Sequence, residues 1–160
     1  YYPVASNDPQ DGFFCNNANS ALLKEVWDEY RFNEVLTGLE DMELAKRIVD
    51  DGKKISYIAE APVYHLHDEN WKVVRNRYER ESIALQKIMP EVHVGKRDLV
   101  RYIISGVLHD LGSAVSERRA ARTIGEIIMF RFMQYWGTYR GNHEHRRLSR
   151  QMKEKYFYPR

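Results

Sequence analysis

Two groups of side chains stand out because their chemistry is complementary. Glu40 and Asp41 form an acidic pair in the segment GLEDMELAKR, and His65 and His67 close the segment VYHLH. A carboxylate can take the proton from a hydroxyl nucleophile. Two imidazoles two residues apart on a strand share one face and can bind a divalent metal. The two groups together would suit a site in which a hydroxyl attacks beside a metal-bound diphosphate.

A third group of polar residues precedes a predicted helix. Asn16, Asn17, Asn19 and Ser20 lie in the segment FFCNNANSA, where small and amide side chains let backbone amides approach an anion or a sugar. We expect these four residues to bind substrate. All three groups also have ordinary structural explanations: acids favour the first turn of a helix, histidines at a strand end bond to nearby acids, and Asn and Ser cap helices and turns.

The spacing of apolar residues and the positions of Gly and Pro predict the elements that would hold these groups. Short strands and amphipathic helices alternate in the first part of the chain, which favours an α/β architecture, and helices fill the second part. The predicted strands are 13–16, 54–58 and 61–65. The predicted helices are 20–29, 39–51, a long helix that begins near Trp71 and ends before Pro90, 98–111 and 116–135.

Charge divides the chain into two parts. Residues 1–95 hold 11 Lys and Arg against 17 Asp and Glu, whereas residues 96–160 hold 14 against 6. We therefore expect an acidic part that carries the motifs and a basic helical part whose charge suits an anionic membrane, nucleic acid or the acidic part of the same chain. The single cysteine, Cys15, excludes an internal disulfide. The longest apolar run is about half the roughly 20 residues of a membrane-spanning helix.

The basic part offers an alternative function. Arginines interleaved with aromatic residues would make a surface for anionic lipid, or, in a nonenzymatic protein, for nucleic acid. The ordinary explanation is that the aromatic rings pack inward and the arginines are solvated. The residues concerned are Arg118, Arg119, Arg122, Arg131, Arg140, Arg146, Arg147 and Arg150, with Phe130, Phe132, Tyr135, Trp136 and Tyr139.

Taken in order, NNANSALLKEVW, GLEDMELAKR and GKKISYIAEAPVYHLH resemble the second half of a family-2 glycosyltransferase with the GT-A fold. These nucleotide-sugar-dependent enzymes build bacterial polysaccharides, and the resemblance covers residues 13–90. It implies the acceptor-side part of a GT-A domain over residues 1–95, followed by a helical extension over residues 96–160. The implied reaction is inverting transfer of a sugar from a nucleotide-sugar donor to a hydroxyl of a glycan or lipid-linked acceptor.

The resemblance also implies a role for each group. Asp41 would be the catalytic base, and Glu40 would orient the acceptor. The asparagine-rich loop would lie beneath donor and acceptor. His65 would complete a metal and diphosphate site that holds Mn²⁺ or Mg²⁺, with His67 as a second candidate for that role.

Two further expectations complete this interpretation. Arg75 and Arg77 on the long helix would reach an acceptor phosphate or carboxylate, unless they are solvated or paired with Glu79 and Glu81. The family also has a nucleotide-binding half with an Asp-x-Asp metal motif, which this sequence lacks. We therefore expect a fragment that does not turn over alone, with a cytoplasmic location, peripheral contact at the inner face of a membrane, and no nucleic-acid partner.

Overall fold

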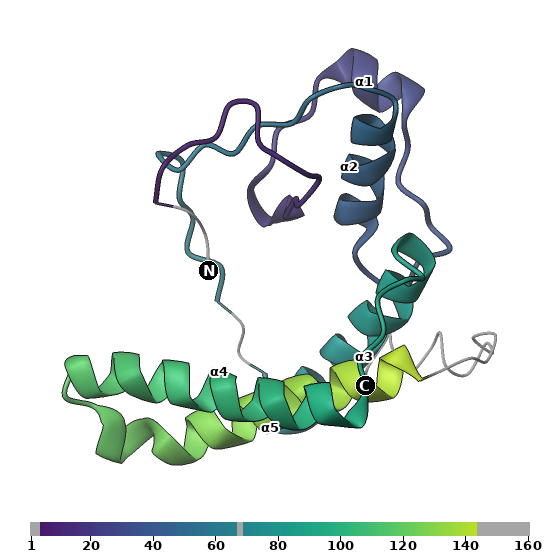
Figure 1. Cartoon of the computed structure of the whole chain (residues 1–160). Helices are drawn as coiled ribbons and strands as arrows, with labels where there is room; N and C mark the ends of the chain where they lie inside the picture. The colour runs from purple at the N-terminus through teal and green to yellow at the C-terminus, as the bar shows by residue number, and fades with distance from the viewer. Residues whose placement is uncertain (1–3, 67–68, 144–160) are drawn as a thin grey trace. The chain divides into compact units, whose positions relative to one another are not determined.

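The computed structural model describes residues 4–66 and 69–143 (Figure 1). The chain divides into two compact units, residues 1–67 and residues 68–160. The first unit contains a 3-10 turn, η1 (Asn17–Asn19), and the helices α1 (Lys24–Glu29) and α2 (Glu40–Asp50). The second contains α3 (Trp71–Ile88), α4 (Lys96–Ser116) and α5 (Ala120–Asn142).

The predicted α/β fold, and with it the GT-A-like domain, is wrong. The regular elements of the described residues are helical, and none of the segments 13–16, 54–58 and 61–65 joins a sheet there. The composition of these segments favours extended backbone, but a strand also needs a partner along its length. Pairing of that kind is decided by the tertiary structure and cannot be seen in one short segment.

One of these segments does find a partial partner. Asn7 and Tyr57 form an isolated antiparallel bridge in which each backbone N–H donates to the other carbonyl at 2.9 Å. Gln10 N donates to Ile55 O at 2.9 Å. The pairing stays this short in part because Pro9, between the two contacts, has no N–H to donate.

A small core holds α2 in the first unit. Tyr30, Leu44 and Ile48 are buried together, with Val26, Phe32 and Ile55 packed against them. Two of the buried side chains lie on α2 four residues apart, on one face of the helix. The predicted helix over residues 39–51 is therefore confirmed, apart from one residue at each end. Gly52 follows with a φ of 80°, the left-handed conformation that often ends a helix.

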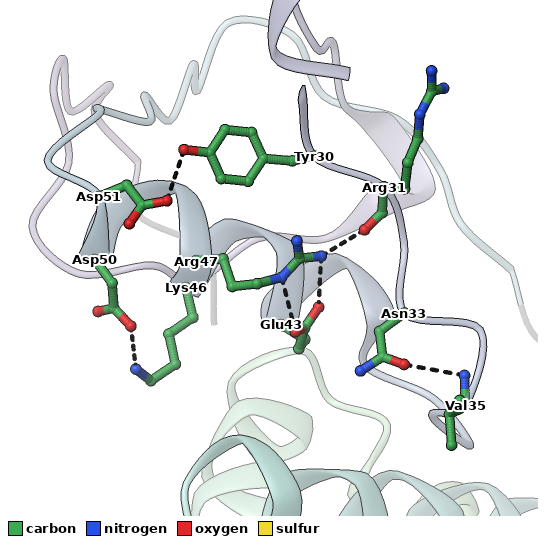
Figure 2. A network of polar contacts seen from close by, with 9 residues as sticks. All are labelled: Tyr30, Arg31, Asn33, Val35, Glu43, Lys46, Arg47, Asp50 and Asp51. Carbon is green, nitrogen blue, oxygen red and sulfur yellow. Dashed lines mark hydrogen bonds and ion pairs between the residues drawn. The ribbon is translucent and has the colours of Figure 1, made fainter. Parts of the chain in front are cut away.

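Polar contacts reinforce this position of α2, as Figure 2 shows. Arg47 donates to Glu43 on the same helix at 2.9 Å and 3.0 Å, and to the backbone carbonyl of Arg31 at 2.5 Å. The hydroxyl of Tyr30 donates to Asp51 at 2.7 Å. These contacts hold residues 30 and 31 against the last turn of α2 and the residue that follows it.

The second unit is built around α5, which packs against both α3 and α4 (Figure 1). The predicted long helix is confirmed as α3. The helix α4 extends beyond the predicted 98–111 at both ends, whereas α5 begins and ends later than the predicted 116–135. Arg131 on α5 joins Asp110 on α4 through two hydrogen bonds of 2.6 Å and 2.7 Å. Among the described residues, no helix combines the length and apolar character needed to cross a bilayer.

The contact between α3 and α5 depends on two glycines. A Cβ atom at Gly137 would lie 2.4 Å from the carbonyl oxygen of Arg75, and one at Gly141 would lie 2.2 Å from that of Glu79. Real Cβ atoms essentially never come that close, so only glycine permits this approach. Asn142 follows in the sequence, is 1% exposed, and bonds to the backbone of Val92 and Val94.

Candidate functional site

Asp41 is held at the first turn of α2 by the asparagine-rich loop. Its Oδ2 accepts a hydrogen bond from the backbone N–H of Asn17 at 2.8 Å, and its Oδ1 accepts one from Met42 N at 2.8 Å. Both contacts fix the direction of the carboxylate. Since each carboxylate oxygen has two lone pairs, Asp41 can still accept a proton or a further hydrogen bond.

The turn that leads into α2 is tightly constrained. Leu36 and Thr37 are buried, with exposed fractions of 6% and 1%. Leu39 has a φ of 56°, in the left-handed region that a leucine rarely adopts. Such a conformation costs of the order of 1–3 kcal/mol and persists only where the surroundings enforce it. The start of α2, and therefore the acidic pair Glu40 and Asp41, is placed by this turn.

Side-chain amides fix the shape of the loop. Asn16 Oδ1 accepts from Ala18 N at 2.9 Å, and the hydroxyl of Ser20 donates to Asn17 Oδ1 at 2.7 Å. Asn19 donates through Nδ2 to the carbonyl of Ala61 at 2.6 Å. The loop therefore lies between α2 on one side and the segment that contains His65 on the other.

A shallow pocket lies where the loop meets that segment. It has a volume of about 350 Å³ and is lined by Ala18 and by Val63, Tyr64, His65 and Leu66. Asp41 does not line this pocket itself, but its hydrogen-bond partner Asn17 is the direct neighbour of Ala18. A ligand seated in the pocket would contact the imidazole and would lie next to the loop that orients Asp41.

Most of the residues predicted for the site belong to the first unit. They include the four loop residues, Asp41 and His65. Asn17 bonds to Asp41, Asn19 bonds to Ala61, and His65 lines the pocket together with Ala18. Ser20 was expected to begin a helix but instead bonds within the loop, and α1 begins only at Lys24. Glu40 lies in the first turn of α2. His67 lies outside the described residues.

Comparison of the chain with protein-family models, curated proteins and solved structures gave no match.

A metal site is not assembled by the residues that the structure describes. Within 4–66 and 69–143, no group of three or more His, Cys, Asp or Glu side chains could hold a metal ion. His65 supplies one imidazole, which is too few donors for a site of Mn²⁺ or Mg²⁺ by itself. The metal site expected from the sequence stays a prediction.

Arg75 and Arg77 belong to the second unit. Arg77 forms an ion pair with Glu69 at 2.9 Å and a longer one with Glu81 at 3.7 Å. Arg75 donates to the side chain of its neighbour Asn76 at 2.9 Å. Arg77 therefore has a structural role on α3, and a role for either arginine in substrate binding stays a prediction.

Cys15 is the residue near the site that sequence reasoning missed. Burial raises the pKa of its thiol, and the negative charge of Asp41 raises that pKa further. The position of Cys15, one residue before the asparagines, was the available signal. The pKa of Cys15 therefore depends on the charge of Asp41, because a negative carboxylate nearby disfavours formation of the negative thiolate.

We expect Asp41→Asn to lower the pKa of Cys15, because the substitution removes the adjacent negative charge. The pH dependence of alkylation by iodoacetamide measures this pKa, since only the thiolate reacts. The alkylation midpoint should move to lower pH in Asp41→Asn and stay in place in Asp50→Asn, at the far end of α2. Equal midpoints in Asp41→Asn and the wild type would show that Asp41 does not lie beside Cys15.

Proposed function

We propose that this chain supplies the acceptor-activating residues for inverting transfer of a sugar, from a nucleotide-sugar donor to a hydroxyl of a glycan or a lipid-linked acceptor. One observation supports this most: the loop that orients Asp41 through the 2.8 Å hydrogen bond from Asn17 also lines the pocket that contains His65. A carboxylate and an imidazole are thus connected by one loop of five residues.

Asp41 acts as the general base in this proposal. The acceptor hydroxyl donates a hydrogen bond to the carboxylate, and its oxygen attacks the anomeric carbon of the donor sugar. The bond from that carbon to the diphosphate oxygen breaks, and the diphosphate leaves with the electron pair. The hydroxyl proton passes to Asp41. A single displacement of this kind inverts the configuration at the anomeric carbon.

The pocket residues face the departing group. An imidazole N–H of His65 can donate a hydrogen bond to a phosphate oxygen, as can backbone amides of the loop. Donors fixed before the reaction stabilise charge that develops in the transition state, with little reorganisation. His65 and the loop therefore bind the diphosphate, whereas Asp41 acts on the acceptor.

The acidic pair fits transfer better than hydrolysis by a two-carboxylate mechanism. Glycosidases place two carboxyl groups about 5–9.5 Å apart on opposite sides of the scissile bond. Glu40 and Asp41 are adjacent residues on one helix, and adjacent positions do not face each other. A single base with a good leaving group, as in a nucleotide sugar, needs only one of them.

The experiment is a transfer assay with the natural gene product that contains residues 1–160. It would be incubated with a panel of nucleotide sugars and oligosaccharide or lipid-linked acceptors, with added Mn²⁺ or Mg²⁺ and after chelation. We expect at least one donor to give nucleotide diphosphate and glycosylated acceptor in equal amounts. Release of nucleotide without transfer, or no consumption of any donor, would count against this function.

A further inference from the structure

The hairpin of α4 and α5 exposes apolar side chains where a surface helix normally carries polar ones. On α4, Val100, Ile104, Leu108 and Val115 are 55–64% exposed. Their spacing places them on one face, because seven or eight residues make two helical turns. This row is called the α4 stripe below.

A second row follows α5. Ile124, Ile128, Phe132 and Trp136 recur every four residues and are 37–48% exposed. The rings of Phe132 and Trp136 are stacked, with centroids 6.3 Å apart. This row is called the α5 stripe below. It lies opposite the glycines at 137 and 141, because successive side chains on a helix turn by about 100°, so it points away from α3.

The two stripes form one face of the hairpin. Gly106 on α4 lies against Arg131 and Tyr135 on α5, which identifies the inner side of each helix. A rotation of about 100° per residue, counted from these inner positions, places both stripes on the same side of the antiparallel pair. The eight residues of the two stripes are called the apolar face below.

Basic residues border this face. The same helical geometry puts Arg97 in line with the α4 stripe, about one turn before Val100. It puts Arg101 at the edge of this stripe away from α5, and Arg122 at the edge of the α5 stripe away from α4. All three are exposed, and the described residues provide no ion pair for them. Residues 96–142 hold eight Lys and Arg against four Asp and Glu, so the hairpin carries a net positive charge.

The structure changes the basic aromatic surface expected from the sequence. Arg131 pairs with Asp110, and Arg140 lies 3.4 Å from the buried Glu79. The ring of Phe130 packs edge-on against Tyr78. These residues serve the packing of the unit, and the expected arginines at 146, 147 and 150 lie outside the described residues. Of the residues expected in that surface, Phe132, Trp136 and Arg122 belong to the apolar face or its border. The other members are Ile124 and Ile128 on α5 and the residues of α4.

We propose that the apolar face of α4 and α5 docks on an anionic lipid surface. An interfacial helix buries an apolar stripe that includes Trp and Phe at the boundary of the headgroups, while basic residues beside it contact anionic lipid. The apolar face has both features, and the bordering arginines match lipid phosphates in charge. The proposal does not depend on sugar transfer, since it concerns residues of the second unit alone.

Sedimentation of the protein with lipid vesicles tests this proposal. We expect binding to vesicles of phosphatidylcholine with phosphatidylglycerol, weaker binding to phosphatidylcholine alone, and a decrease as salt rises. The double variant Leu108→Ser with Ile128→Ser should bind at least about tenfold more weakly, because it removes two apolar side chains from the buried surface. Replacing the three bordering arginines by Gln should weaken binding by about a hundredfold.

Controls separate this result from misfolding and from self-association. Val35→Ser removes another exposed apolar side chain, in the first unit, and should bind vesicles as the wild type does. Circular dichroism should show unchanged helix content in every variant, because the replaced residues are exposed. Absence of vesicle binding by the wild type, or full binding by the Leu108 and Ile128 variant, would overturn the proposal. So would a lipid-free oligomer that this variant dissociates, since the face would then bind a second copy.

Discussion

Gly141→Ala should lower the free energy of unfolding of the second unit by about 2–3 kcal/mol, because the added methyl group has no room. Its Cβ atom would lie 2.2 Å from the carbonyl oxygen of Glu79 and 2.8 Å from the Cβ of Ser82. The first neighbour is helix backbone and cannot move aside as a flexible side chain can. The whole of α3 would have to shift away from α5, which would also loosen the ion pair between Arg140 and Glu79.

A matched control lies on the same helix. Gly125 has nothing within 4 Å of an added Cβ, so Gly125→Ala should stabilise the unit by up to about 1 kcal/mol through higher helix propensity. Chemical denaturation followed by circular dichroism measures both changes. Opposite signs for the two variants are the expected result. A Gly141→Ala variant as stable as Gly125→Ala would mean that α3 and α5 do not approach this closely.

The helices could largely be predicted from the sequence, because local signals determine them. The apolar spacing of α2 and α3 and the glycine after α2 gave bounds close to those observed. The strands could not be predicted in the same way. The segments 54–58 and 61–65 contain residues that fit extended backbone, yet a strand forms only where a distant segment pairs with it backbone to backbone. Among the described residues, 7–10 pairs in this way with 54–58 over a short stretch, through Asn7 and Gln10.

The candidate site, too, could be predicted from the sequence only in part. The chemistry of Asp41, His65 and the asparagines could be recognised from residue types, and their gathering in one unit agrees with that interpretation. The hydrogen bond from Asn17 to Asp41 joins residues 24 positions apart, and no local pattern predicts such a contact. The glycine pair of α5 was equally hidden, although a spacing of four residues is typical of closely packed helices.

Asp41→Asn should lower kcat for sugar transfer by about a hundredfold to ten-thousandfold, the usual range for loss of a general base. The amide oxygen of Asn can still accept the hydrogen bond from Asn17, which holds the loop, whereas the contact with Met42 N is lost. The amide cannot take the hydroxyl proton. We therefore expect the KM for the donor to stay nearly constant while kcat falls, as measured by steady-state kinetics on the natural gene product.

Asp50→Asn is the control for this substitution. Asp50 ends the same helix and pairs with Lys46 on the surface at 2.5 Å, so its loss removes one carboxylate without touching the site. Its kcat should stay within about twofold of the wild type, because surface ion pairs contribute little. Near-full activity in Asp41→Asn, or an equal loss in both variants, would contradict the role of Asp41 as base.

The anomeric configuration of the first transfer product reports whether Asp41 acts as a base on the acceptor. Proton NMR of the reaction mixture distinguishes the two anomers of the transferred sugar, whose configuration is fixed by the new glycosidic bond. If Asp41 acts as a base on the acceptor hydroxyl, the product has the configuration opposite to that of the donor. A product that retains the donor configuration would contradict the account, because the first displacement would then have come from a group on the protein.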